Sequence, residues 1–148
     1  MREILFRGKQ EDNGEWVYGA YYHQTEFYGD DCDYHYIISS CDELEDNMMC
    51  FDGVIPETVG QYTGLTDKNG QKIFEGDIVA QNWYDHNEPA DDSFGEVVFC
   101  EYDCSFSVID VEKDGIVPLG KCHAYHWEAE VIGNIHDNPE LIESEDNK

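Results

Sequence analysis

Short β-prone runs separated by turn-forming residues constrain the fold of this chain most. Asn69-Gly70 lies between the runs Gln61-Tyr62-Thr63 and Lys72-Ile73-Phe74, and Asp12-Asn13-Gly14 separates two earlier runs. β-branched and aromatic residues favour strands, and Asn-Gly is the preferred pair for a type I′ turn because both central residues need a positive φ. The sequence therefore predicts antiparallel hairpins, with a type I′ turn at Asn69-Gly70.

The same alternation of β-prone runs and turn-forming residues predicts the other elements. We expect an initial hairpin from residues 3–7 and 15–23, a hairpin over 58–74, and further strands near 77–83, 95–102, 105–111 and 128–135. Two segments are expected to be irregular. Residues 24–50 form an acidic segment with one short strand over 34–39 and either a short helix or a loop over 41–49, and residues 84–94 form a polar loop.

These elements predict a mainly β fold, or a β-rich α+β fold, in which helix is scarce. Gly76-Asp77 opens one strand and Gly95 opens the next, a layout typical of an SH3-like barrel in the C-terminal half. A chain of 148 residues can form one domain with a core or two small subdomains. The expected division is 1–57 as an N-terminal β-hairpin with an acidic irregular segment, 58–141 as a β-barrel-like core, and 142–148 as a disordered tail.

Charge restricts the class of partner. The chain has 34 Asp and Glu against 8 Lys and Arg, which gives a formal net charge of −26. No Lys or Arg lies between Lys9 and Lys68 or between Lys72 and Lys113. Such a surface repels phosphates, so direct nucleic-acid binding is not expected, whereas a basic protein could be attracted. The simpler interpretation is that the acids only maintain solubility.

Membrane and secretory signals are missing from the sequence. It has no apolar run near 18 residues, and no basic segment followed by an apolar one begins the chain. The expectation is a protein that stays in the cytoplasm without contact with a membrane.

The segment 63–79 raises the question of calcium, because Asp67 and Asn69 have the spacing of the first two ligands in an EF-hand loop. The match fails beyond that point. Position 6 of the loop, where glycine makes the sharp turn, is Lys72, and position 12, where glutamate binds calcium with both oxygens, is Ile78. The segment is interpreted as a hairpin.

The cysteines offer one possible metal site. Because disulfides are not expected in the cytoplasm, the choice lies between buried thiols and metal ligands. Cys100 and Cys104 with Cys122 and His126 supply four zinc-type ligands in two pairs. The spacing argues against them, because on a strand Cys100 and Cys104 would lie about 13 Å apart, at about 3.3 Å per residue. We expect buried thiols, no metal and no other cofactor. The six cysteines are Cys32, Cys41, Cys50, Cys100, Cys104 and Cys122.

Enzymatic activity is not predicted. The chain contains none of the motifs GxSxG, Walker A, HExxH or GxGxxG. Alternation places His126, Glu128 and Glu130 on one strand face, which could bind a divalent metal but is typical of a solvated face. Carboxylates are so numerous that no pair can be singled out as an acid–base couple.

Three blocks of sequence resemble the YopX family. They are MREILFRGK with NGEWVYG, then PETVGQYTGLTDKNGQKIFEGDIV, then EVIGNIHDNPEL, in the order found in that family. The family consists of small proteins encoded by bacteriophages and prophages, so the resemblance implies a largely β protein acting in the cytoplasm of a bacterial host. It implies no catalytic residue or cofactor. Segments 24–50 and 84–94 lie outside these blocks.

Two classes of function are consistent with these observations. The first is a non-enzymatic accessory module that contacts a host or phage protein through aromatic side chains and is expected to form a homo-oligomer. Its candidate residues are Tyr21, Tyr22, Phe27 and Tyr28, whose alternative role is core packing. The second is a decoy whose carboxylates imitate DNA phosphates and occupy a DNA-binding protein of the host.

Overall fold

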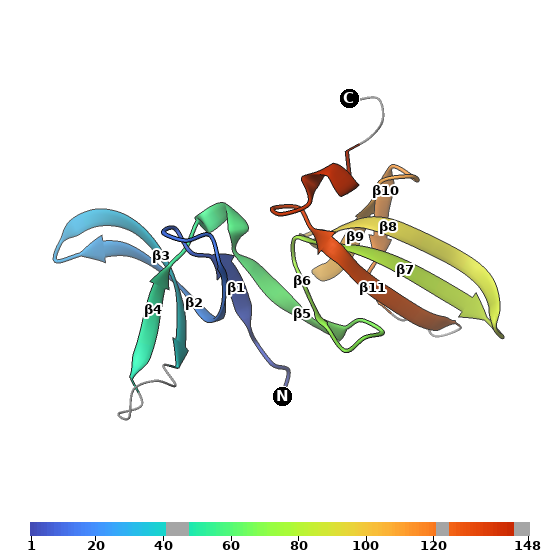
Figure 1. Ribbon diagram of the computed structural model, residues 1–148, viewed down its shortest axis with the longest axis horizontal. Helices are drawn as coiled ribbons and strands as arrows, with labels where there is room; N and C mark the ends of the chain where they lie inside the picture. The colour runs from blue at the N-terminus through green and yellow to red at the C-terminus, as the bar shows by residue number, and fades with distance from the viewer. Residues whose placement is uncertain (41–47, 121–124, 144–148) are drawn as a thin grey trace. The chain divides into compact units, whose positions relative to one another are not determined.

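A computed structural model describes residues 1–40, 48–120 and 125–143 of the chain. The described residues form antiparallel strands and two short 3-10 helices (Figure 1). The chain divides into two compact units, Met1–Tyr62 and Thr63–Lys148. Mainly β structure is therefore confirmed. The strands are β1 (Phe6–Lys9), β2 (Trp16–Phe27), β3 (Asp30–Ser40), β4 (Met49–Gly53), β5 (Gly60–Thr66), β6 (Lys72–Phe74), β7 (Asp77–Asp85), β8 (Glu88–Cys100), β9 (Ser105–Asp110), β10 (Gly115–Pro118) and β11 (His126–Asn134), and the 3-10 helices are η1 (Pro56–Thr58) and η2 (Pro139–Leu141).

The first sheet has the strand order β4-β3-β2-β1-β5-β6, and β5 carries the chain from the first unit into the second. The expected initial hairpin is present as β1 and β2, in which Phe6 pairs with Gly19 and Lys9 pairs with Trp16. No helix among the described residues has the length and apolar character needed to cross a membrane.

Residues 24–33, which were expected to be irregular, belong instead to a long hairpin of β2 and β3, and the short strand expected over 34–39 lies within β3. The strands pair from Ala20 with Ile38 to Phe27 with Asp30. Tyr28 and Gly29 close the hairpin with φ of 50° and 84°, the positive values that a two-residue type I′ turn requires. Tyrosine seldom adopts a positive φ, so the sequence alone gave little indication of this turn. The helix or loop expected over 41–49 falls largely outside the described residues.

The core of the first unit lies against one face of this sheet. Ile37 and Val54 are fully buried, and the rings of Phe6 and Tyr21 pack with their centroids 5.7 Å apart. Thr58, in η1, accepts a hydrogen bond from the Lys9 amide and donates one to the Ile55 carbonyl.

The second sheet has the order β10-β9-β8-β7-β11. The polar loop expected over 84–94 is instead the end of a hairpin: β7 continues to Asp85 and β8 begins at Glu88. His86 and Asn87 close it with φ of 49° and 71°. A tight turn with two positive φ values again replaces an expected loop.

The predicted SH3-like barrel is not what the strand pairing shows. Among the described strands, β10 and β11 form the two edges of the second sheet. They do not pair with each other, so the sheet does not close into a barrel. The reason is the extended β7–β8 hairpin. Residues expected to leave the sheet as a loop instead prolong both strands into a long ribbon, and the sheet stays open.

The predicted hairpin of 58–74 forms from β5 and β6, but its turn is not type I′. Gly70 has φ of 82°, whereas Asn69 is not among the residues with positive φ. The Gly70 amide donates to the Asp67 carbonyl at 3.0 Å, as in a type I turn followed by a left-handed glycine. The Asp67 carboxylate accepts hydrogen bonds from the amides of Asn69, Gln71 and Val131. Asp67 thus has a structural role in the segment that resembles a calcium loop.

The second unit has an apolar core, and Gln81 is one of several buried polar side chains beside it. The core residues are Ile73, Val79, Val97, Val108 and Ala129. Gln81 has no exposed surface, and its amide makes four hydrogen bonds. Its nitrogen donates to Ser93 Oγ and the Pro118 carbonyl, and its oxygen accepts from the Gly120 amide and Trp127 Nε1.

Candidate functional site

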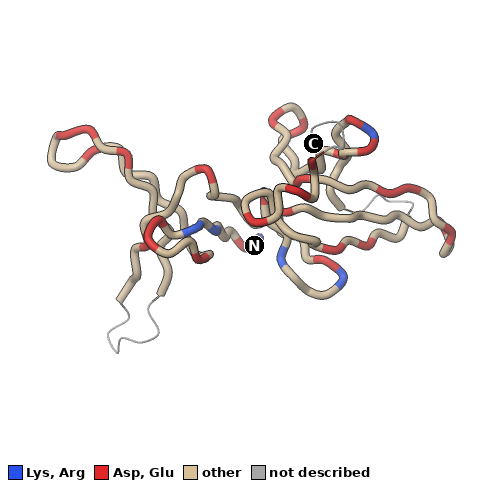
Figure 2. The backbone as a smooth tube through the Cα atoms, turned by 45° about the horizontal axis from the view of Figure 1, so that its top comes forward, with Lys and Arg blue, Asp and Glu red and all other residues tan. Residues whose placement is uncertain are grey.

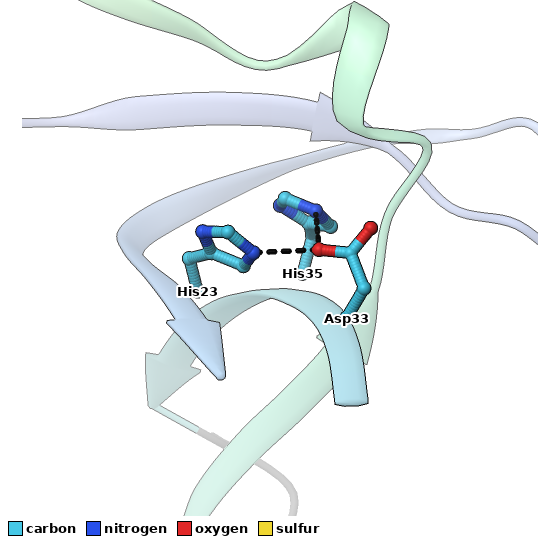
Figure 3. A group of neighbouring side chains, drawn as sticks. All are labelled: His23, Asp33 and His35. Carbon is cyan, nitrogen blue, oxygen red and sulfur yellow. Dashed lines mark hydrogen bonds and ion pairs between the residues drawn. The ribbon is translucent and has the colours of Figure 1, made fainter. Parts of the chain in front are cut away.

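Two histidines and an aspartate meet about midway along the β2–β3 hairpin (Figure 3). His23 and His35 lie opposite each other in the strand pairing, and Asp33 precedes His35 by two residues, which puts it on the same face. Asp33 Oδ1 lies 2.6 Å from His23 Nε2 and 3.0 Å from His35 Nε2. One carboxylate oxygen is therefore shared by two imidazoles.

A column of rings links this cluster to the core. The His23 and His35 rings are stacked, with centroids 4.1 Å apart and planes inclined by 13°. The Tyr21 and His35 rings are nearly parallel, with centroids 5.9 Å apart, and the tyrosine hydroxyl lies 2.5 Å from His35 Nδ1. The His35 side chain is only 12% exposed, against 42% for His23 and 75% for Asp33. His35 is thus largely buried and contacts Tyr21, whereas His23 and Asp33 face solvent.

Charges, hydrogen bonds and burial shift the pKa values of Asp33 and Tyr21. The hydrogen bond from His23 and the nearby His35 hold the pKa of Asp33 below its usual range, although burial opposes them. Burial and the Asp33 charge raise the pKa of Tyr21. Asp33 is therefore an ionised acceptor near neutral pH, and the tyrosine hydroxyl stays protonated.

This cluster is not among the candidate sites that the sequence predicts. The expected strands over 15–23 and 34–39 contain His23 and His35, but residues 24–33 between them were expected to be irregular, so no pairing placed His35 opposite His23. The usable signal was the alternation His23, Tyr21 in one strand and His35, Asp33 in the next. A hairpin turn at Tyr28-Gly29 would have brought them together.

The opposite face of the same sheet carries exposed aromatic side chains. Tyr22 pairs with Tyr36 across β2 and β3, and Phe51 in β4 pairs with Ile38, so alternation puts these side chains on one face. Tyr22 is 48% exposed and Phe51 is 59% exposed. The Tyr36 ring contacts both Tyr34 and Phe51. We define the aromatic face as Tyr18, Tyr22, Tyr34, Tyr36, Met49 and Phe51.

The four residues predicted to bind protein do not gather on one surface. Tyr22 lies on the aromatic face, whereas Tyr21 is half-buried on the opposite face beside His35. Phe27 and Tyr28 are exposed at the hairpin tip, where their rings pack edge to face at 4.4 Å. Core packing, the alternative role considered for all four, fits Tyr21 alone. Whether any of them binds a partner stays a prediction.

The residues of the candidate zinc set occupy different places. Cys100 ends β8, and Cys104 lies in the turn before β9 with φ of 51°. His126 begins β11 and lies 3.3 Å from Glu128 Oε1. Cys122 lies outside the described residues. Within the described ranges, Cys100, Cys104 and His126 do not form a group of three converging ligands, whereas His23, Asp33 and His35 do, with their ligand atoms within 4.8 Å of one another.

The expectation of buried thiols is not met: Cys32 and Cys100 are partly exposed and Cys104 is exposed. Cys32, Cys100 and Cys104 are free, but Cys50 is disulfide-bonded. Burial and three nearby carboxylates raise the pKa of Cys32, so its thiol stays protonated near neutral pH. Cys32 donates a hydrogen bond to the Gln24 carbonyl.

Strand order and pairing define an antiparallel β protein with two sheets. Comparison of its sequence with known families matches the YopX protein family over residues 5–143, and the chain belongs to that family. No curated protein matches it. Two solved structures share the fold. Protein EF1440 from Enterococcus faecalis is 23% identical with a TM-score of 0.51, and protein yopX from Bacillus subtilis is 18% identical with a TM-score of 0.50. Each alignment covers 97% of this chain and 100% of the other.

Proposed function

We propose that this YopX-family protein is a phage- or prophage-encoded accessory module without enzymatic activity, which binds another protein through the aromatic face of its first sheet. The observation that carries the proposal is the exposure of Tyr18, Tyr22, Tyr34 and Phe51, each at 48% or more. Sheets normally cover large apolar side chains or place them singly at the surface, and a contiguous group of them is typical of an interaction site.

The chemistry of the aromatic face supports protein rather than nucleic acid as the partner. Tyrosine and phenylalanine supply large, rigid contact area and are enriched at protein interfaces. Acidic residues occur along both units and cations are few (Figure 2), so phosphate backbones are repelled. A host or phage protein in the bacterial cytoplasm, with an apolar site bordered by basic residues, fits both properties.

The variant Tyr22→Ser/Phe51→Ser tests the proposal. Both side chains point to solvent, so the fold should persist, while a partner captured from bacterial lysate by the parent protein should no longer be retained. Tyr102→Ser is the matched control, because Tyr102 is fully exposed in the second unit. Retention of the same partner by the double variant would contradict the role of the aromatic face. Sedimentation of the parent protein and of both variants tests the predicted homo-oligomer. If it forms through the aromatic face, Tyr22→Ser/Phe51→Ser should lose it and Tyr102→Ser should keep it.

A second candidate function rests on the distribution of charge. The segments between Lys9 and Lys68 and between Lys72 and Lys113 have no cation, and they hold 14 and 11 acidic residues counted along the sequence. A decoy that imitates DNA would bind its target through these carboxylates. It would lose affinity steeply with salt and compete with duplex DNA, which a contact through the aromatic face would not.

A further inference from the structure

We propose that His23, Asp33 and His35 bind one divalent transition-metal ion of the zinc class. The three side chains offer two imidazole nitrogens and a carboxylate oxygen, the donors that zinc, cobalt and nickel ions take in proteins. This site is separate from the aromatic face, since it lies on the other face of the sheet, and the inference does not depend on the proposed function.

The ligand atoms already converge. Asp33 Oδ1 lies 2.6 Å from His23 Nε2 and 3.0 Å from His35 Nε2. Two ligands of a tetrahedral zinc ion are about 3.4 Å apart when both bonds are about 2.1 Å long. Each of the two N···O distances to Asp33 must therefore increase by less than about 1 Å for an ion to replace the shared protons.

One rearrangement is required, and the structure permits it. An imidazole binds metal in the plane of its ring, whereas the two rings are inclined by only 13°. One ring must turn so that both lone pairs point to the same ion. His23 is the ring that can turn, because its side chain is 42% exposed, whereas His35 is only 12% exposed and is held by Tyr21.

Tyr21 acts as a positioning residue for this site. Its hydroxyl lies 2.5 Å from Nδ1 of His35. In the neutral tautomer that carries its proton on Nε2, His35 donates to Asp33 and its Nδ1 accepts from the tyrosine. With metal on Nε2, the proton moves to Nδ1, which then donates to the same hydroxyl. Metal-bound histidines usually have such a partner on the second nitrogen, which fixes the tautomer and orients the ring.

The donor set also predicts selectivity. Imidazole nitrogens favour zinc, cobalt and nickel, whereas magnesium and calcium prefer oxygen ligands. The many exposed carboxylates of this chain will attract all divalent ions weakly, so the site must be measured in the presence of millimolar Mg²⁺. Three protein ligands leave at least one coordination position for water or for a group from a partner.

The experiment is a calorimetric titration of the full chain with ZnCl₂ in excess Mg²⁺, together with NMR of the histidine side-chain nitrogens. We expect one equivalent bound and shifted ring nitrogens for His23 and His35. His23→Gln and Asp33→Asn should weaken binding at least about 10-fold. Tyr21→Phe should weaken it by about 10- to 100-fold while leaving the stoichiometry at one, the range seen when such outer partners are removed.

Two controls separate this site from other zinc ligands. His126→Gln removes an exposed histidine that also lies beside a carboxylate, Glu128, and should leave the affinity unchanged. Cys100→Ser/Cys104→Ser removes two free thiols and should also leave it unchanged. Thermal melts in chelator verify that each variant is folded. Affinity unaltered by His23→Gln, or lost in the cysteine variant instead, would overturn the proposal.

Discussion

Replacing Gln81 with methionine tests how the second unit is held together. Methionine has nearly the same length and only a slightly larger volume, so the main loss is the set of four hydrogen bonds made by the amide. The Gly120 amide and Trp127 Nε1 would each lose their acceptor.

The expected cost follows from these two donors. A buried donor left without a partner costs about 1–3 kcal/mol, so two would cost about 2–6 kcal/mol. Trp127 is partly exposed, so its indole can reach water, and the methionine side chain recovers some apolar contact. We therefore expect the free energy of unfolding of the second unit to fall by about 2–4 kcal/mol.

Urea denaturation followed by tryptophan fluorescence provides the assay, because Trp83 donates to the Gly120 carbonyl and Trp127 donates to Gln81 itself. Gln71→Met is the matched control, since the Gln71 side chain is exposed. Amide hydrogen exchange at Gly120 gives a local measure and should accelerate only in Gln81→Met. Equal denaturation midpoints for the two variants would refute the inference that the Gln81 amide organises this part of the core.

Three further predictions concern individual side chains. Gly70→Val should destabilise the protein by about 1–3 kcal/mol because a β-branched residue resists positive φ, whereas Gly70→Asn should be milder; equal melting temperatures would contradict this. Burial raises the pKa of Glu96, so its ionised form is less stable in the folded protein. Glu96→Gln should therefore raise the melting temperature at neutral pH, and the gain should vanish as pH falls through the raised folded-state pKa to below the usual carboxyl value; a gain independent of pH would be inconsistent. Calcium should bind weakly at physiological salt, and a stoichiometric micromolar site found by calorimetry would contradict the structural role of Asp67.

Local patterns predicted the fold class well and the strand lengths poorly. The runs around Trp16, Ile73, Val79 and Val97 are rich in β-branched and aromatic residues, and each lies in a strand near the predicted place. Their alternation predicts burial of one face, which the structure shows around Val97, whereas Ile78 and Val79 in β7 are both fully buried. These patterns did not predict that strands extend through polar residues, as β8 does from Glu88 to Phe94.

The errors have a common physical origin in the turns. Tyr28-Gly29 and His86-Asn87 adopt positive φ, although neither pair is the usual choice for a two-residue turn. Asn69-Gly70, which is the usual choice, adopts positive φ only at the glycine because Asp67 binds the amides of the loop. Turn geometry is thus set by side-chain hydrogen bonds and by strand pairing that local sequence does not specify.

The candidate site depended on those turns. Once Tyr28-Gly29 closes a hairpin, His23 and His35 face each other and Asp33 joins them. The same register puts Tyr22 and Tyr36 together on the opposite face. Both surfaces are consequences of pairing between residues far enough apart in sequence that composition could not reveal them.

The most direct test of the proposed function measures the affinity of one captured partner from low to high salt, with and without competing duplex DNA. Docking on the aromatic face buries apolar area, so screening with a Debye length of about 8 Å at physiological salt should weaken it only modestly. DNA should not compete, and Tyr22→Ser/Phe51→Ser should reduce affinity at least about 30-fold if these residues include a hot spot worth about 2 kcal/mol. Steep loss with salt, displacement by DNA and an unchanged affinity in the double variant would together contradict the aromatic face and favour the decoy.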